Sequence, residues 1–162
     1  MVATTKSGQS LSAAHGSSDL YDLDYVSWID RQVTLLRAGR LTEIDAENVA
    51  EELSDLGKVQ FYRLQGSLKI LVMHMLKWDQ QSEHRSASWE GTIREHRRRI
   101  RRLVDKNPGL KPRLPEALAE SYEDARGWAS IETGIPDDDF PAECPYVWSD
   151  VMDRVFAMDR KL

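Results

Sequence analysis

The longest run of helical periodicity in the chain is EIDAENVAEELSDLGKVQFYRLQGSLKILVMHMLKWDQ, residues 43–80. Apolar or small residues recur along it every three or four positions, which is the period of one helix face. The positions in this phase are Ala46, Ala50, Leu53, Gly57, Leu64, Leu68, Leu71, Met75 and Trp78. Because the phase continues across Gly57, the pattern predicts one long helix over about 43–80, bent or weakened at that glycine. Two shorter helices are the alternative.

The second half of this stretch carries further apolar residues outside the main stripe, including Ile70, Val72 and Leu76. A helix that is apolar nearly all round is packed on several sides. We therefore expect this half to be the centre of the fold.

Four other segments show helical periodicity. They are a helix over about 22–38 that stops at Gly39, a basic helix capped by Ser86 or Ser88, a helix from Pro115 to about Glu132 that stops at Gly134, and a short helix bearing Trp148 to Phe156. No segment shows strand alternation. The sequence predicts an all-α, single-domain bundle of about five helices over residues 21–158, with a flexible tail at 1–20 and a short end at 159–162.

Composition limits the classes of function. The chain has 162 residues, a formal charge of −5 and a sequence pI near 5.4, which disfavours a general nucleic-acid binder. Cys144 is the only cysteine, so an intramolecular disulfide and a four-thiolate zinc site are both excluded. With no signal-peptide core and no long apolar run, we expect a cytoplasmic protein that does not enter a membrane.

The basic helix contains WEGTIREHRRRIRRLV, residues 89–104, with six arginines beside an apolar stripe. Its spacing predicts that Arg94, Arg98, Arg101 and Arg102 face solvent, whereas Arg97 and Arg99 flank the stripe and suit internal pairs. Arginine suits bidentate binding of phosphate or carboxylate. The solvent-facing arginines are therefore a candidate binding site for an acidic protein surface or a nucleic acid; an ordinary solvated face paired with its own Asp and Glu is the alternative.

His74, with Lys77 one turn later, is a candidate internal polar site, although a hydrogen-bonded structural histidine is the commoner arrangement. The histidines form no i, i+4 pair and no Glu-x-x-His motif, so we expect no metal site and no cofactor. We assign no catalytic residue, because Cys144 lies beside Glu143 and no serine-nucleophile or phosphate-loop motif is present.

Six segments occur in an order typical of one bacterial family. They are LLRAGR at 35–40, EELSDLG at 51–57, LVMHMLKW at 71–78, SWEGTIRE at 88–95, YEDAR at 122–126 and FPAECPY at 140–146. Together they resemble the domain of unknown function 29 family. The resemblance covers most of the chain from Tyr21 to Phe156 and implies a helical fold without implying an activity, a ligand or a catalytic residue. His96 departs from the family, where glutamine is expected more often.

The sequence thus favours a non-enzymatic protein-interaction module of unidentified partner and oligomeric state. Nucleic-acid association through the Arg94 to Arg102 face is the second hypothesis. An enzyme built around His74 is the third.

Overall fold

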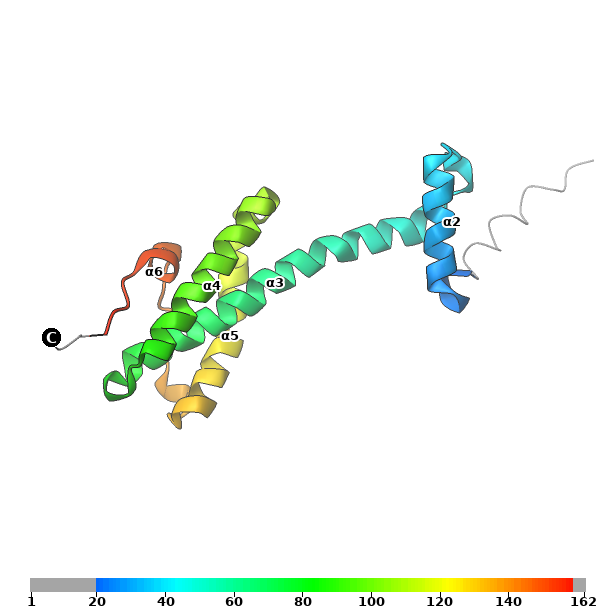
Figure 1. Cartoon of the computed structure of the whole chain (residues 1–162). Helices are drawn as coiled ribbons and strands as arrows, with labels where there is room; N and C mark the ends of the chain where they lie inside the picture. Colours follow the sequence, from blue (N-terminus) through cyan, green and yellow to red (C-terminus); the bar gives the residue numbers. More distant parts are fainter. Residues whose placement is uncertain (1–19, 159–162) are drawn as a thin grey trace, which may run out of the picture. The chain divides into compact units, whose positions relative to one another are not determined.

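The computed structural model describes residues 20–158; residues 1–19 of the expected tail and 159–162 of the expected C-terminal end lie outside the described residues. The described chain is all-α and contains no strand, which confirms the predicted class. Short 3-10 turns join its helices (Figure 1). The bounds are α2 Tyr25–Arg37, α3 Ala46–Gln80, α4 Ala87–Lys106, α5 Leu114–Thr133 and α6 Trp148–Asp153.

Local capping sets where α2 and α3 begin. We expected one helix from about Asp22; residues 20–23 are helical, but the helix is interrupted at Asp24 before α2 begins at Tyr25. The Asp24 side chain accepts a hydrogen bond from the Ser27 backbone N–H (3.1 Å) and caps α2. Helix α3 begins at Ala46, after a 3-10 turn at Leu41–Glu43, and continues through Gly57 to Gln80. The prediction of one long helix is therefore confirmed, and the alternative of two shorter helices is not observed.

The predicted domain contains two compact units, Met1–Gly57 and Lys58–Leu162. The structure describes residues 20–57 of the first, here called the N-terminal unit, and residues 58–158 of the second, the C-terminal unit. Helix α3 contributes residues to both, so each unit is described by itself.

In the N-terminal unit, α2 is tied to the start of α3 by polar side chains around Trp28. The Trp28 indole N–H donates to Asp45 Oδ2 (3.2 Å). Both carboxylate oxygens of Glu52 accept from tyrosine hydroxyls, at 2.7 Å from Tyr21 and 2.5 Å from Tyr25. The hydrogen bond to Glu52 raises the pKa of Tyr21 to about 12. Trp28 and Leu35 are the buried apolar residues of this unit, so its core is small.

In the C-terminal unit, the second half of α3 lies between α4 and α5 (Figure 1). Leu64, Leu68, Leu71 and Met75 have no exposed surface, and Val72 and Leu76 beside them are also buried. Ile93 and Ile100 of α4 and three alanines of α5 complete the core; the alanines are Ala117, Ala125 and Ala129. Burying one large apolar side chain stabilises a fold by about 1.5–3 kcal/mol. The predicted central helix is thus confirmed here.

The remaining helix ends follow from sequence signals. Ser86 caps α4, accepting from the Trp89 N–H at 3.3 Å. Helix α5 ends at Gly134, whose φ of 72° is left-handed and favours glycine. Helix α6 ends at Asp153, and Phe156 is buried beyond its end. No helix within residues 20–158 is both long and apolar enough to cross a membrane.

Candidate anion-binding face of helix α4

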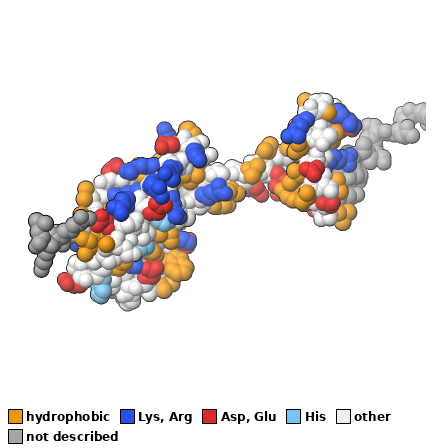
Figure 2. All heavy atoms as spheres, in the orientation of Figure 1, with side chains coloured by type: hydrophobic (Ala, Val, Ile, Leu, Met, Phe, Trp, Pro, Cys, Tyr) orange, Lys and Arg blue, Asp and Glu red, His pale blue; other side chains and the backbone are white. Residues whose placement is uncertain are grey.

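Helix α4 has one apolar side and one cationic side. Ile93, Ile100 and Val104 are buried, as the spacing predicts. Lys and Arg side chains gather over the part of the surface formed by α4 in Figure 2. The six arginines nevertheless fall into groups with different contacts, which the spacing alone does not separate.

Arg97 binds the C-terminal end of α6. Its guanidinium donates from Nε to the Val151 carbonyl (2.7 Å), from Nη1 to the Arg154 carbonyl (2.7 Å) and from Nη2 to the Asp150 carbonyl (3.0 Å). These carbonyls include acceptors that a helix end leaves without an intrahelical partner. The positive charge also matches the negative end of the helix dipole. Arg97 makes internal contacts, as its position predicts, but to backbone carbonyls instead of carboxylates.

Arg101 contacts the same end of α6. Its Nη2 donates to the Met152 carbonyl (3.0 Å) and lies 3.3 Å from an Asp153 carboxylate oxygen. The guanidinium is still about half exposed. The sequence placed Arg101 with the solvent-facing arginines, and the structure adds an anchoring contact to α6 that helical spacing could not indicate.

Two further arginines share one carboxylate. Glu95 accepts from Arg98 at 2.6 Å and from Arg99 at 2.9 Å, and these hydrogen bonds lower the pKa of Glu95. Arg94 has only a long contact of 3.9 Å to Glu90 and is 79% exposed. Arg102 is exposed and pairs with no residue that the structure describes. Arg99 is as exposed as Arg98. The three arginines that the spacing predicts to face solvent and that make no contact with α6, namely Arg94, Arg98 and Arg102, are here called the outer arginines.

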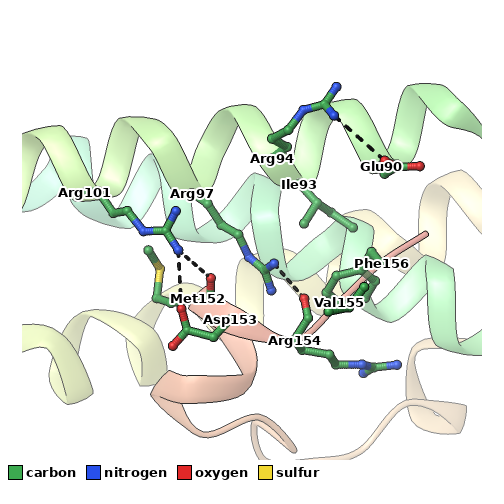
Figure 3. Close-up of a pocket in the computed structure, with 10 residues that line it drawn as sticks. All are labelled: Glu90, Ile93, Arg94, Arg97, Arg101, Met152, Asp153, Arg154, Val155 and Phe156. Atoms are coloured by element: carbon green, nitrogen blue, oxygen red, sulfur yellow. Dashed lines mark hydrogen bonds and ion pairs between the residues drawn. The ribbon is translucent and has the colours of Figure 1, made fainter.

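A pocket of about 330 Å³ lies between α4 and the segment that follows α6 (Figure 3). We call it the α4 pocket. Figure 3 shows Arg97 pointing from α4 towards Arg154 and Arg101 pointing towards Met152 and Asp153 of α6, whereas Arg94 extends away from them towards Glu90. Burial and the nearby charges of Arg101 and Arg154 lower the pKa of Arg97. The pocket thus holds a positive charge that is only partly neutralised.

The candidate polar site at His74 and Lys77 has two separate sets of contacts. His74 Nδ1 lies 2.9 Å from the Ile70 carbonyl oxygen of its own helix, and burial lowers the pKa of His74. Lys77 is buried, forms an ion pair with Glu132 and lies over the Trp89 ring at 4.5 Å. These contacts orient both side chains within the fold. Neither residue lines the α4 pocket.

A carboxylate that the sequence reasoning missed organises the end of the C-terminal unit. Asp79 accepts from the Tyr146 hydroxyl (2.8 Å) and pairs with both terminal nitrogens of Arg154, at 2.8 and 2.5 Å. Arg154 and Arg97 also lie over the Phe156 ring, with their guanidinium carbons 4.8 and 5.2 Å from the ring centroid. These partners are far apart in sequence, so no local pattern could have indicated the network.

A second pocket, of about 490 Å³, lies where YEDAR and FPAECPY meet, between Tyr122 and Arg126 on one side and Ala142 to Cys144 on the other. Burial raises the pKa of the Cys144 thiol, which disfavours the nucleophilic thiolate. Within residues 20–158, no group of three or more His, Cys, Asp or Glu side chains is arranged to hold a metal ion.

Comparison with known proteins identifies the family. A family model described as "Domain of unknown function DUF29" matches residues 20–157. The chain belongs to the DUF29 family. No curated protein and no solved structure matches this DUF29 chain. The family description names no activity, ligand or partner, so a function has to be argued from the surfaces described above.

Proposed function

We propose that the chain is a cytoplasmic protein-interaction module whose N-terminal unit binds a basic amphipathic helix of another protein. The observation that carries this proposal is the change in exposure along α3. The stripe that is fully buried at Leu64 and Leu68 continues in the same helical phase to Leu53, which is 63% exposed. Leu56 beside it is 62% exposed.

Other apolar side chains of the N-terminal unit are exposed as well. Leu23, Val26 and Leu41 are 82%, 69% and 66% exposed. Scattered apolar residues on a protein surface are ordinary, but a group of them on a unit with a small core marks an interaction surface.

Charge selects the kind of partner. Residues 20–57 contain nine Asp and Glu against three Arg, a formal charge of −6, whereas residues 58–158 contain sixteen of each kind. Two copies of an acidic surface repel each other, whereas a partner with Lys and Arg beside an apolar stripe is attracted to it. An amphipathic helix can lay its apolar face on exposed apolar side chains. A basic amphipathic helix therefore fits the surface better than a second copy of the chain does.

The test is site-specific photo-crosslinking in the native cytoplasm. A photoreactive phenylalanine analogue replaces Leu56 in one version of the full chain and Ile131, an exposed residue of α5, in the control version. We expect the first version to crosslink to a basic amphipathic segment, identified by mass spectrometry, and Leu53→Lys to remove that crosslink. A crosslink to another copy of this chain, to an acidic segment, or equally from both positions would contradict the proposal.

A second candidate is binding of an acidic protein surface or a nucleic acid through the basic face of α4, with Arg94, Arg98, Arg101 and Arg102 as contacts. The exposure of Arg94 and Arg102 supports it. The contacts of Arg98 with Glu95 and of Arg101 with α6 count against it, because they occupy part of the cationic group.

The second candidate has a direct test. The triple variant Arg94→Glu, Arg98→Glu and Arg102→Glu leaves the contact between Arg101 and α6 intact. If nucleic acid is the ligand, this variant loses affinity for a DNA or RNA oligonucleotide, and affinity of the unmodified chain falls steeply with salt. Equal affinity of the triple variant and the unmodified chain would show that the outer arginines do not bind nucleic acid. An enzyme centred on His74 gains no support from the contacts of that residue.

A further inference from the structure

The α4 pocket has an excess of cationic groups over an apolar floor. Four arginines and two carboxylates line it; they are Arg94, Arg97, Arg101, Arg154, Glu90 and Asp153. The floor is formed by Ile93, Met152 and Phe156, all buried. Its volume of about 330 Å³ is at the small end of the range for ligand pockets, which begins near 300 Å³.

Not every arginine N–H in the pocket is used. Both terminal nitrogens of Arg154 already donate to Asp79, so Arg154 is a weaker candidate donor for a ligand. Each guanidinium has five N–H donors. The contacts of Arg97 with three carbonyls leave one donor on each terminal nitrogen, and Arg101 contacts α6 through Nη2 alone. Arg97 and Arg101 can therefore donate to an anion while they hold α6.

We propose that the α4 pocket binds a carboxylate carried on a short apolar chain. A carboxylate presents two oxygens in one plane, which matches the fork of a guanidinium. The apolar part of the ligand would lie against Ile93 and Phe156, a contact that inorganic phosphate cannot make. This site is separate from the surface of the N-terminal unit and does not depend on the proposed function.

One residue that lines the pocket is exposed enough to be substituted without disturbing the fold, so it can test the site. Val155 lines the pocket and is 83% exposed, so Val155→Asp places a negative charge at the site without opening a cavity. The matched control is Ile131→Asp, which makes a comparable change at a 74% exposed position of α5 that does not line the pocket. Arg101→Gln removes a direct donor, and its fold is checked by circular dichroism because Arg101 also contacts α6.

The experiment titrates hexanoate into the ¹⁵N-labelled full chain and follows amide shifts by NMR. We expect saturable shifts confined to residues 93–101 and 150–156. Affinity should be about tenfold lower in Arg101→Gln, which loses one charge-assisted hydrogen bond. Affinity should also be about tenfold lower in Val155→Asp, whose carboxylate repels the ligand carboxylate. Ile131→Asp should bind as the unmodified chain does. Hexanol, with the same chain and no charge, should give no saturable shift.

Three results would overturn the assignment. Absence of saturable shifts with hexanoate would remove the site. Equal weakening in Ile131→Asp would show that total charge, and not the pocket, controls binding. Phosphate binding as tightly as hexanoate would show that the apolar floor plays no part, so the ligand class would be wrong.

Discussion

The two halves of α3 have the same apolar pattern and opposite surroundings. From Leu64 to Met75 the stripe is completely buried between α4 and α5, whereas at Leu53 and Leu56 it is more than 60% exposed. The units also differ in charge, −6 for residues 20–57 against zero for residues 58–158. An apolar stripe thus predicts that a helix forms, but not whether the same chain covers it. The uncovered half is where a partner is expected.

Polar contacts reinforce this difference. In the N-terminal unit the polar contacts join residues up to 31 positions apart, as with Tyr21 and Glu52. In the C-terminal unit they include partly buried contacts between segments that are more than fifty residues apart, as with Arg97 and α6. We therefore expect substitutions in the C-terminal unit to cost stability and those in the N-terminal unit to cost binding.

The largest effect is expected at Leu68, which has no exposed surface. Leu68→Ala should lower the free energy of unfolding by about 2–5 kcal/mol, because it removes buried apolar contacts and leaves a cavity. Urea denaturation monitored by circular dichroism measures this. A loss below about 1 kcal/mol would mean that the C-terminal unit is not the stable core of the protein.

The next largest effect is expected at Arg97. Arg97→Met keeps much of the apolar stem but removes three hydrogen bonds to α6, so the free energy of unfolding should fall by about 2–3 kcal/mol. Hydrogen exchange should show earlier opening of residues 148–156. Arg102→Met, on the exposed side of the same helix, serves as the control, and an equal loss there would refute the anchoring role.

Acidification should weaken the C-terminal unit. Burial lowers the pKa of both His74 and His96; Lys77 and Glu132 face the first ring, and Arg99, Glu95 and His74 face the second. As pH falls below about 6.5, the unfolded chain takes up protons that the folded chain does not, so the free energy of unfolding decreases until the lower folded-state pKa is reached. Urea denaturation between pH 7.5 and pH 5 measures this slope. The double variant His74→Gln and His96→Gln should show a smaller change of the free energy of unfolding with pH. An unchanged slope would show that other groups cause the pH dependence.

The smallest effect on stability is expected at Leu53. Leu53→Ala should change the free energy of unfolding of the isolated chain by no more than about 0.5 kcal/mol, because its side chain is mostly in solvent. The same urea titration compares it directly with Leu68→Ala. A loss comparable to that of Leu68→Ala would show that the stripe is covered in solution, and the contrast between the two halves of α3 would fail.

The sequence by itself determined the helical class, the family and most helix bounds. The long helix through Gly57, the cap at Ser86 and the stop at Gly134 follow from signals within a few residues, because helical hydrogen bonds and caps are local. The interruption at Asp24, between the helical residues 20–23 and α2, was missed because the Asp24 cap was not recognised.

The contacts of the arginines on the basic helix depend on tertiary structure. Helical spacing puts six arginines on α4 but does not show that Arg97 and Arg101 bind α6 while Arg94 and Arg102 stay in solvent. Those partners are about fifty residues away in sequence, and the contacts form only because the end of α6 packs against α4. The α4 pocket and the Asp79 network arise in the same way, from long-range packing that no local pattern encodes.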